Sequence, residues 1–140
     1  MVTRIVLAYN HSPPARRALN TAVRLAQRDG AELFVVAVER SLLFSGDSIT
    51  EVRNAHAARE RSCTGWLSAA LAYADEHNVP LRTEIRIGLV ARQLAAAAAT
   101  HRADLLILGR SHRDFIRWRL RGTIVDQVSH HARCPVLIIP

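Results

Sequence analysis

The residues whose types and spacing could do chemistry lie near the end of the chain, between Leu105 and Pro140. The apolar run Leu105–Leu108 predicts a buried parallel strand, and Gly109 ends it where the chain must turn. After a basic segment, Gly122 and Thr123 open a predicted helix. Backbone N–H groups at a helix start attract anions, and glycines let a phosphate approach the backbone. This order of strand, glycine loop and helix start predicts an anion-binding site.

The segment between Gly109 and Gly122 is strongly basic and carries two aromatic residues, Phe115 and Trp118. Its candidates for phosphate contacts are Arg110 and Arg113. Arginines interleaved with aromatic rings can also bind nucleic acid by charge and stacking. No recognised nucleic-acid-binding module accompanies the segment. We therefore favour a solvated loop, or one docked on the body or on a second subunit, over a nucleic-acid surface.

Length and composition bound the remaining possibilities. The 140 residues suit a single domain, 1–140, with a hydrophobic core, and no apolar run is long enough to cross a bilayer or to serve as a secretory signal. Cys63 and Cys134, the only cysteines, form neither a disulfide framework nor a zinc-type pattern. The net charge of +7 comes from arginines spread along the chain, apart from the cluster after Gly109. We expect a cytoplasmic protein with no membrane association.

Strand-like and helix-like segments alternate along the chain. Apolar or alternating runs predict strands, and apolar residues at helical spacing predict helices. The predicted strands are Thr3–Ala8, Glu32–Val38, Leu81–Ile87, Leu105–Leu108 and Pro135–Ile139, and the predicted helices are Pro13–Asp29, Ile49–His77, Val90–Thr100 and one capped by Thr123. This alternation predicts an α/β fold, in which a five-stranded parallel sheet carries helices on both faces.

Local signals refine these elements. Ser12 suits the N-cap of the first helix and Gly30 its left-handed C-terminal cap. Apolar and charged residues alternate in Leu81–Ile87, which predicts a half-exposed strand at a sheet edge. The long second helix has an apolar stripe for the core: Cys63, Trp66, Leu67, Ala70, Leu71 and Ala74.

Ligands of open parallel sheets bind outside the carboxyl ends of the strands, where the strand order reverses. If the first strand is central, the crevice lies between Asn10-His11-Ser12 and the loop from Gly109 to Thr123. His11 and His112 could meet across it, but lone histidines near loops are usually only polar residues.

No other pattern indicates catalysis or a metal. His130 and His131 are adjacent on a helix and point in different directions, so they cannot easily share a metal ion. His56 is interpreted as a lone polar residue and Glu39 as an isolated carboxylate. The motifs G-x-S-x-G, H-E-x-x-H and G-x-x-x-x-G-K-[ST] do not occur. We therefore expect a protein that is not an enzyme, apart from slow incidental ATP hydrolysis.

The C-terminal motif resembles the signature of the universal stress protein family. In that signature a strand ends in G-x-x-G, nine residues follow, then G-S or G-T, and a helix leads to a last strand with C-P-V. Gly109, the nine-residue spacer, Gly122-Thr123 and Cys134-Pro135-Val136 match, while His112 replaces the second glycine. The resemblance implies a Rossmann-like fold of the adenine nucleotide alpha hydrolase type, with strand order 3-2-1-4-5.

The resemblance also implies a nucleotide site. In the family, an Asp after the first strand lies near the adenosine, and here that position is Asn10. The base contacts the end of the second strand, and the glycines hold the phosphates. The implied binding residues are Asn10, Val38, Gly88, Gly109, His112, Gly122 and Thr123. His112 would occupy part of the phosphate space, or it would donate a hydrogen bond to a phosphate oxygen.

Two functions therefore stay open. The first is a regulatory protein of the stress response that binds ATP, with Mg, at the carboxyl ends of strands 1 and 4. The second is a dimeric interaction module that binds no nucleotide and has a degenerate phosphate loop. The family commonly dimerises through its last strand, which would otherwise leave an apolar edge bare. We expect a homodimer through Val136, Leu137, Ile138 and Ile139, and an unidentified protein partner.

Overall fold

The computed structural model describes residues 1–40, 49–110 and 124–140, so the predictions for His112, Arg113, Gly122 and Thr123 lie outside the described residues. The strands are β1 (Arg4–Ala8), β2 (Glu32–Arg40), β3 (Leu81–Gly88), β4 (Leu105–Gly109) and β5 (Val136–Ile139). The helices are α1 (Pro13–Asp29), α2 (Ile49–Glu76), α3 (Val90–Thr100) and α5 (Ile124–His131). The predicted order of strands and helices is confirmed.

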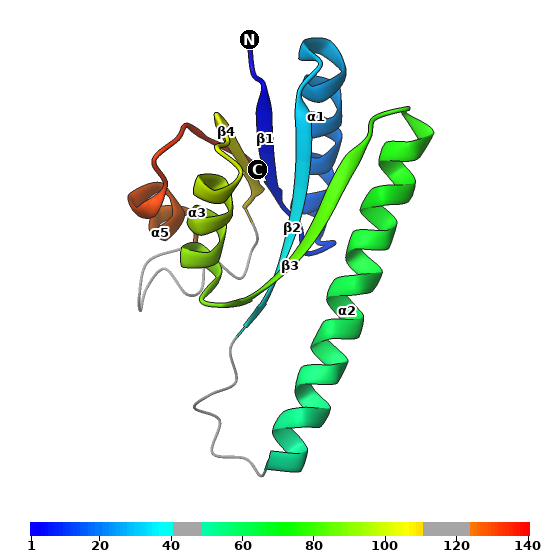
Figure 1. Ribbon diagram of the computed structural model, residues 1–140, viewed down its shortest axis with the longest axis vertical. Coiled ribbons are helices and arrows are strands. Elements are labelled where there is room, and N and C mark those ends of the chain that lie inside the picture. The colour runs from blue at the N-terminus through cyan, green and yellow to red at the C-terminus, as the bar shows by residue number, and fades with distance from the viewer. Residues whose placement is uncertain (41–48, 111–123) are drawn as a thin grey trace.

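All five strands form one sheet in the order β3-β2-β1-β4-β5, and every neighbouring pair is parallel (Figure 1). This is the predicted order. The strand β3 lies at one edge of the sheet, as predicted, and all of its residues are at least partly exposed, with the apolar Ile87 54% exposed. The order reverses between β1 and β4, so the crevice expected for a ligand lies at their carboxyl ends.

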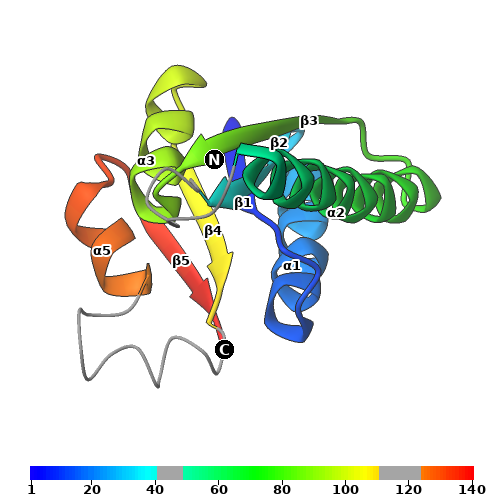
Figure 2. The ribbon, with the colours of Figure 1, turned by 90° about the horizontal axis from the view of Figure 1, so that it is seen from below.

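Helices cover both faces of the sheet, as Figure 2 shows: α1 and α2 lie on one side, and α3 and α5 on the other. The buried side chains of the strands form two core layers, one on each face of the sheet, because successive residues point to opposite faces. Toward α1 and α2 the core holds Ile5, Leu7, Val35, Ala37 and Ile107. Toward α3 and α5 it holds Val6, Phe34, Val36, Leu106 and Leu108.

The first helix has the predicted caps. The Ser12 hydroxyl accepts a hydrogen bond from the Ala15 N–H at 3.3 Å, and Gly30 ends the helix with φ 65° and ψ 30°. An Ala at position 30 would be strained, because left-handed backbone favours glycine.

The second helix packs with only part of its length. Cys63, Leu67, Ala70 and Ala74 are buried as predicted, but Leu71 is 40% exposed. The lower end of α2 in Figure 1 extends past the sheet, and most residues of its first turns are exposed. Although α2 is long, no described helix is both long and apolar enough to cross a membrane.

Two aspartates form hydrogen bonds with residues 2–4 at the start of β1. They lie at the amino ends of the strands, which we call the amino edge of the sheet. Asp104 accepts hydrogen bonds from the Thr3 N–H at 2.8 Å, the Thr3 hydroxyl at 2.9 Å and the Arg4 N–H at 3.0 Å. Desolvation raises the pKa of Asp104, but these hydrogen bonds outweigh it and leave the pKa below its ordinary value. The hydrogen bond from Arg28, followed by that from the Val2 N–H, lowers the pKa of Asp29 to about 2.

Candidate functional site

A pocket of about 400 Å³ lies at the carboxyl ends of β1, β2 and β4. This is the position predicted from the topology of the sheet. One wall comes from the strands and the loop after β1, and the others come from α2, α3 and the start of α5. Its described lining consists of Ala8, Tyr9, Asn10, Ala15, Val36, Val38, Glu39, Arg59, Ser62, Cys63, Trp66, Val90, Leu94, Leu108, Gly109 and Ile124.

Three of the predicted site residues, Asn10, Val38 and Gly109, meet in this pocket although they come from three different parts of the chain. Gly88 ends β3 and is not among the described lining residues. Val90, two residues further along the chain, lines the pocket instead. Arg110 is exposed next to Gly109, and its N–H donates to the Ile139 carbonyl at 2.8 Å.

Gly109 is required for packing against the start of α1. A Cβ at this position would lie 2.6 Å from the Pro14 carbonyl oxygen and 2.7 Å from the Ala15 nitrogen, both of which are backbone atoms. Those distances are too short for a side chain, and backbone cannot move aside cheaply. The glycine therefore brings β4 and α1 together beneath the pocket.

The start of α1 has no backbone donor left for a ligand. Pro13 and Pro14 have no N–H group, and the Ala15 N–H is used by the Ser12 hydroxyl. The Ser12 N–H donates to the Asn10 side-chain oxygen at 3.2 Å. Asn10 thus serves the turn with its oxygen, and this helix can offer a phosphate its dipole but no N–H.

The loop after β1 is held by an aromatic pair. The Tyr9 hydroxyl and the His11 Nδ1 are 3.0 Å apart, and His11 occupies left-handed backbone with φ 60°. Burial raises the pKa of Tyr9, partly offset by the charge of Arg16. His11 therefore has a partner of its own beside the pocket.

The wall from α2 was not predicted. Arg59, Ser62, Cys63 and Trp66 recur three and four residues apart, so they share one face of the helix and turn it toward the carboxyl ends of the strands. Helical spacing identified Cys63 and Trp66 as core residues, but no sequence pattern showed that this stripe reaches a ligand pocket. Burial and then the nearby charge of Glu39 raise the pKa of Cys63, which keeps it a thiol.

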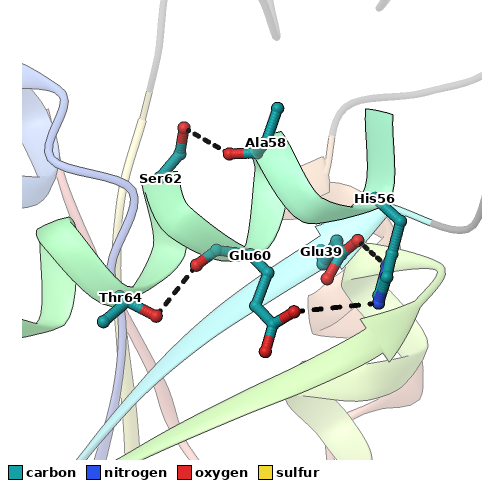
Figure 3. Close-up of polar contacts among 6 residues, drawn as sticks. All are labelled: Glu39, His56, Ala58, Glu60, Ser62 and Thr64. Atoms are coloured by element: carbon teal, nitrogen blue, oxygen red, sulfur yellow. Dashed lines mark hydrogen bonds and ion pairs between the residues drawn. The ribbon is translucent and has the colours of Figure 1, made fainter. Parts of the chain in front are cut away.

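Glu39 and His56 form the second feature that the sequence did not reveal. The strand β2 runs two residues beyond the predicted end at Val38, because its pairing with β3 continues through Glu39 and Arg40. Glu39 is thereby placed on the same face as Ala37 and points toward α2, as Figure 3 shows. Its side chain is 1% exposed.

The His56 ring on α2 covers this carboxylate. Its Nδ1–H donates to Oε1 of Glu39, and its Nε2 lies 3.9 Å from Oε2 of Glu60 (Figure 3). The second carboxylate oxygen of Glu39, Oε2, is buried and has no hydrogen-bond partner in the described part of the chain. The alternation of Val35, Ala37 and Glu39 was the one available signal for an inward-facing carboxylate.

The comparison with protein families decides which family this chain belongs to. The model described as "Universal stress protein family" matches residues 1–140. The chain belongs to the universal stress protein family. The resemblance seen in the C-terminal motif is therefore confirmed over the whole chain.

Individual universal stress proteins are similar along their full length. Universal stress protein Sll1388 of Synechocystis is 24% identical, with 97% of this chain and 96% of that protein covered. A universal stress protein solved in complex with cAMP has a TM-score of 0.79 and 20% identity, covering 99% of this chain and 97% of the other. One from Archaeoglobus fulgidus in complex with dAMP has a TM-score of 0.70 and 18% identity, covering 99% and 98%. At these identities the two structures establish the common fold.

The pocket of this universal stress protein is lined mostly by apolar side chains, with a few polar ones. Aliphatic side chains of β2, β4 and α3 face the polar residues of α2 across it. In the described ranges 1–40, 49–110 and 124–140, no three His, Cys, Asp or Glu side chains are placed to hold a metal ion.

Proposed function

We propose that this protein is a regulatory protein that binds an adenine nucleotide at the carboxyl edge of its sheet. The observation that carries the proposal is the pocket of about 400 Å³ where the strand order reverses between β1 and β4. Membership of the universal stress protein family supports an adenine nucleotide over other ligands. The proposed role is binding, and nothing in it requires turnover.

The ligands of the two structural neighbours support the same choice. Both cAMP and dAMP contain adenine and a phosphate. They share no free ribose hydroxyl, since the 3′ oxygen of cAMP is closed into the ring and dAMP lacks the 2′ hydroxyl. The base is therefore the larger common group, and Val38, Val90 and Leu94 would supply apolar contacts to it.

Charge sets the orientation that we propose. The phosphates would lie away from the buried carboxylate of Glu39 on β2 and toward Gly109 and Arg110 at the end of β4. The start of α1 beside Gly109 would favour them through its dipole alone. Whether the phosphate end takes ATP with Mg would then depend on the segment that contains His112.

Isothermal titration with AMP, and with ATP and Mg, tests the proposal. We expect micromolar binding by the wild type and at least about tenfold weaker binding by Val38→Trp, whose ring would fill the base position. The matched control is Ile49→Trp, because Ile49 is 74% exposed at the start of α2 and is not among the described lining residues. Equal affinity in Val38→Trp and wild type would place the nucleotide elsewhere.

The variant His112→Gly separates the two functions left open by the sequence. If ATP binds only to this variant, the base pocket is intact and His112 closes the phosphate end. If neither the variant nor the wild type binds AMP or ATP, the proposal fails, and a dimeric interaction module without nucleotide is the better description.

We also propose that two copies associate through β5. This strand pairs with β4 on one side only among the described strands, and its four residues, Val136–Ile139, are only partly buried. An apolar strand with an open edge pairs readily with another copy. Light scattering at micromolar concentration should give the mass of a dimer, and a monomer would contradict the assignment.

A further inference from the structure

The carboxylate of Glu39 is the polar group in the pocket that the proposed nucleotide site leaves unexplained. Its side chain is 1% exposed, and Glu39 is one of the residues that line the pocket. One oxygen, Oε1, accepts a hydrogen bond from His56, while Oε2 is buried without a partner among the described residues. A buried carboxylate oxygen that accepts no hydrogen bond costs free energy, so such groups call for an explanation.

The position of this oxygen indicates what would satisfy it. Glu39 directly follows Val38, the residue expected to contact the base, and both line the same pocket. His56 holds Oε1 from the side of α2, which leaves Oε2 as the carboxylate oxygen without a partner among the described residues (Figure 3). The terminal torsion of a glutamate is soft, and the His56 side chain is 45% exposed and can follow Oε1, so a small rotation would bring Oε2 to a donor in the pocket.

The chemistry of an ionised carboxylate restricts that group to a donor. It accepts hydrogen bonds, donates none and repels phosphate. The donors of an adenosine nucleotide are its exocyclic amine and its ribose hydroxyls. With the phosphates toward Gly109 and Arg110, as proposed above, a base on Val38 would direct its amine, which lies at the end of the purine away from the ribose, to the β2 end of the pocket.

We infer that Glu39 reads the base: Oε2 accepts a hydrogen bond from the exocyclic amine of adenine, and His56 positions the carboxylate through Oε1. This assignment rests on the proposed function and adds to it a residue that determines specificity. It gives the site a means to prefer purines with an amine at that position. A pocket lined with aliphatic side chains alone would discriminate only weakly.

The test compares AMP with purine riboside 5′-monophosphate, which differs only by the absence of the amine. We expect the wild type to bind AMP about tenfold to a hundredfold more tightly, which is the usual range for a hydrogen bond to a charged group. In Glu39→Met the two nucleotides should bind within about twofold of each other, because neither then has an acceptor at that position. The wild-type comparison needs no variant to fold.

The matched control is Glu32→Met, which removes the same charge from the other end of β2, where the side chain is 54% exposed. It should keep the wild-type preference for AMP. A second comparison, of AMP with dAMP, should give the same ratio in Glu39→Met as in the wild type.

Each other outcome overturns the assignment in a distinct way. Equal wild-type affinity for AMP and purine riboside 5′-monophosphate would mean that a water molecule, not the amine, satisfies Oε2. A preference that persists in Glu39→Met would place the recognition of the amine elsewhere. A change in the ratio of AMP to dAMP instead would assign Glu39 to the ribose. If neither the wild type nor His112→Gly binds AMP, ATP or the analogue, the proposed function itself fails, and this assignment fails with it.

Discussion

Two carboxylates at opposite edges of the sheet have contrasting surroundings. At the amino edge, Asp104 accepts three hydrogen bonds from Thr3 and Arg4, and both of its oxygens are used. At the carboxyl edge, Glu39 accepts one hydrogen bond from His56, and its other oxygen has no partner in the described part of the chain. The more deeply buried of the two groups is thus the less satisfied one.

We interpret this difference as one between a group that stabilises the fold and a group that we propose binds a ligand. The hydrogen bonds of Asp104 are formed within the protein and need no ligand, so they contribute to the free energy of unfolding. The burial of Glu39 costs free energy that the described residues offset only in part, and a donor group of a ligand would complete the offset. The amino edge is therefore expected to govern stability, and the carboxyl edge to govern binding.

The largest effect expected from this contrast is that of Asp104→Ala. The substitution leaves the N–H groups of Thr3 and Arg4 without their acceptor. We expect it to lower the free energy of unfolding by about 2 kcal/mol, since hydrogen bonds to a charged group are lost in a partly exposed setting. Urea unfolding at neutral pH measures this change.

The control for this measurement is Asp75→Ala, which removes an exposed aspartate from α2. An exposed position of this kind should change stability by no more than about 0.5 kcal/mol. Equal changes in the free energy of unfolding for the two substitutions would show that the hydrogen bonds of Asp104 do not stabilise the fold.

A smaller effect of opposite sign is expected for Glu39→Met. An apolar side chain of similar length removes the uncompensated oxygen, while His56, whose side chain is 45% exposed, can be hydrated instead. We expect the free energy of unfolding to stay the same or to rise by up to about 1 kcal/mol. A loss comparable to that of Asp104→Ala, in the same urea experiment, would show that Glu39 supports the fold and would end the contrast.

The smallest effect expected is a loss of stability at acid pH. The pKa of Asp29 is lowered from 3.8 to about 2 in the folded protein. A depressed pKa means that the stability from this group is fully present above pH 3.8 and is lost as the pH falls through the folded value. The pKa of Asp104 is shifted in the same direction and adds to the loss.

Thermal unfolding between about pH 4 and pH 2 should therefore show a falling midpoint, with a shallower fall in Asp29→Asn than in the wild type. The control is Asp75→Asn, which should follow the wild-type curve. Parallel curves for Asp29→Asn and the wild type would show that Asp29 does not contribute to the acid sensitivity of the amino edge.

The sequence by itself determined the elements and their alternation. Strand and helix periods, the Ser12 cap and the Gly30 cap are properties of neighbouring residues, so they can be seen without the fold. Alternation of strands with helices then requires a parallel sheet, and the C-terminal glycine motif identified the family. The strand order and the carboxyl-edge location of the site followed from these signals.

Only the tertiary structure decided how the pocket is built. Glu39 and His56 are 17 residues apart, and their pairing depends on how α2 crosses the end of β2. Gly109 was expected to serve a turn or a phosphate, but its position against α1 shows that it is needed for space. Leu71 fits the apolar stripe of α2 yet is 40% exposed. Period and propensity are local, whereas burial and hydrogen-bond satisfaction depend on segments that meet only in the folded chain.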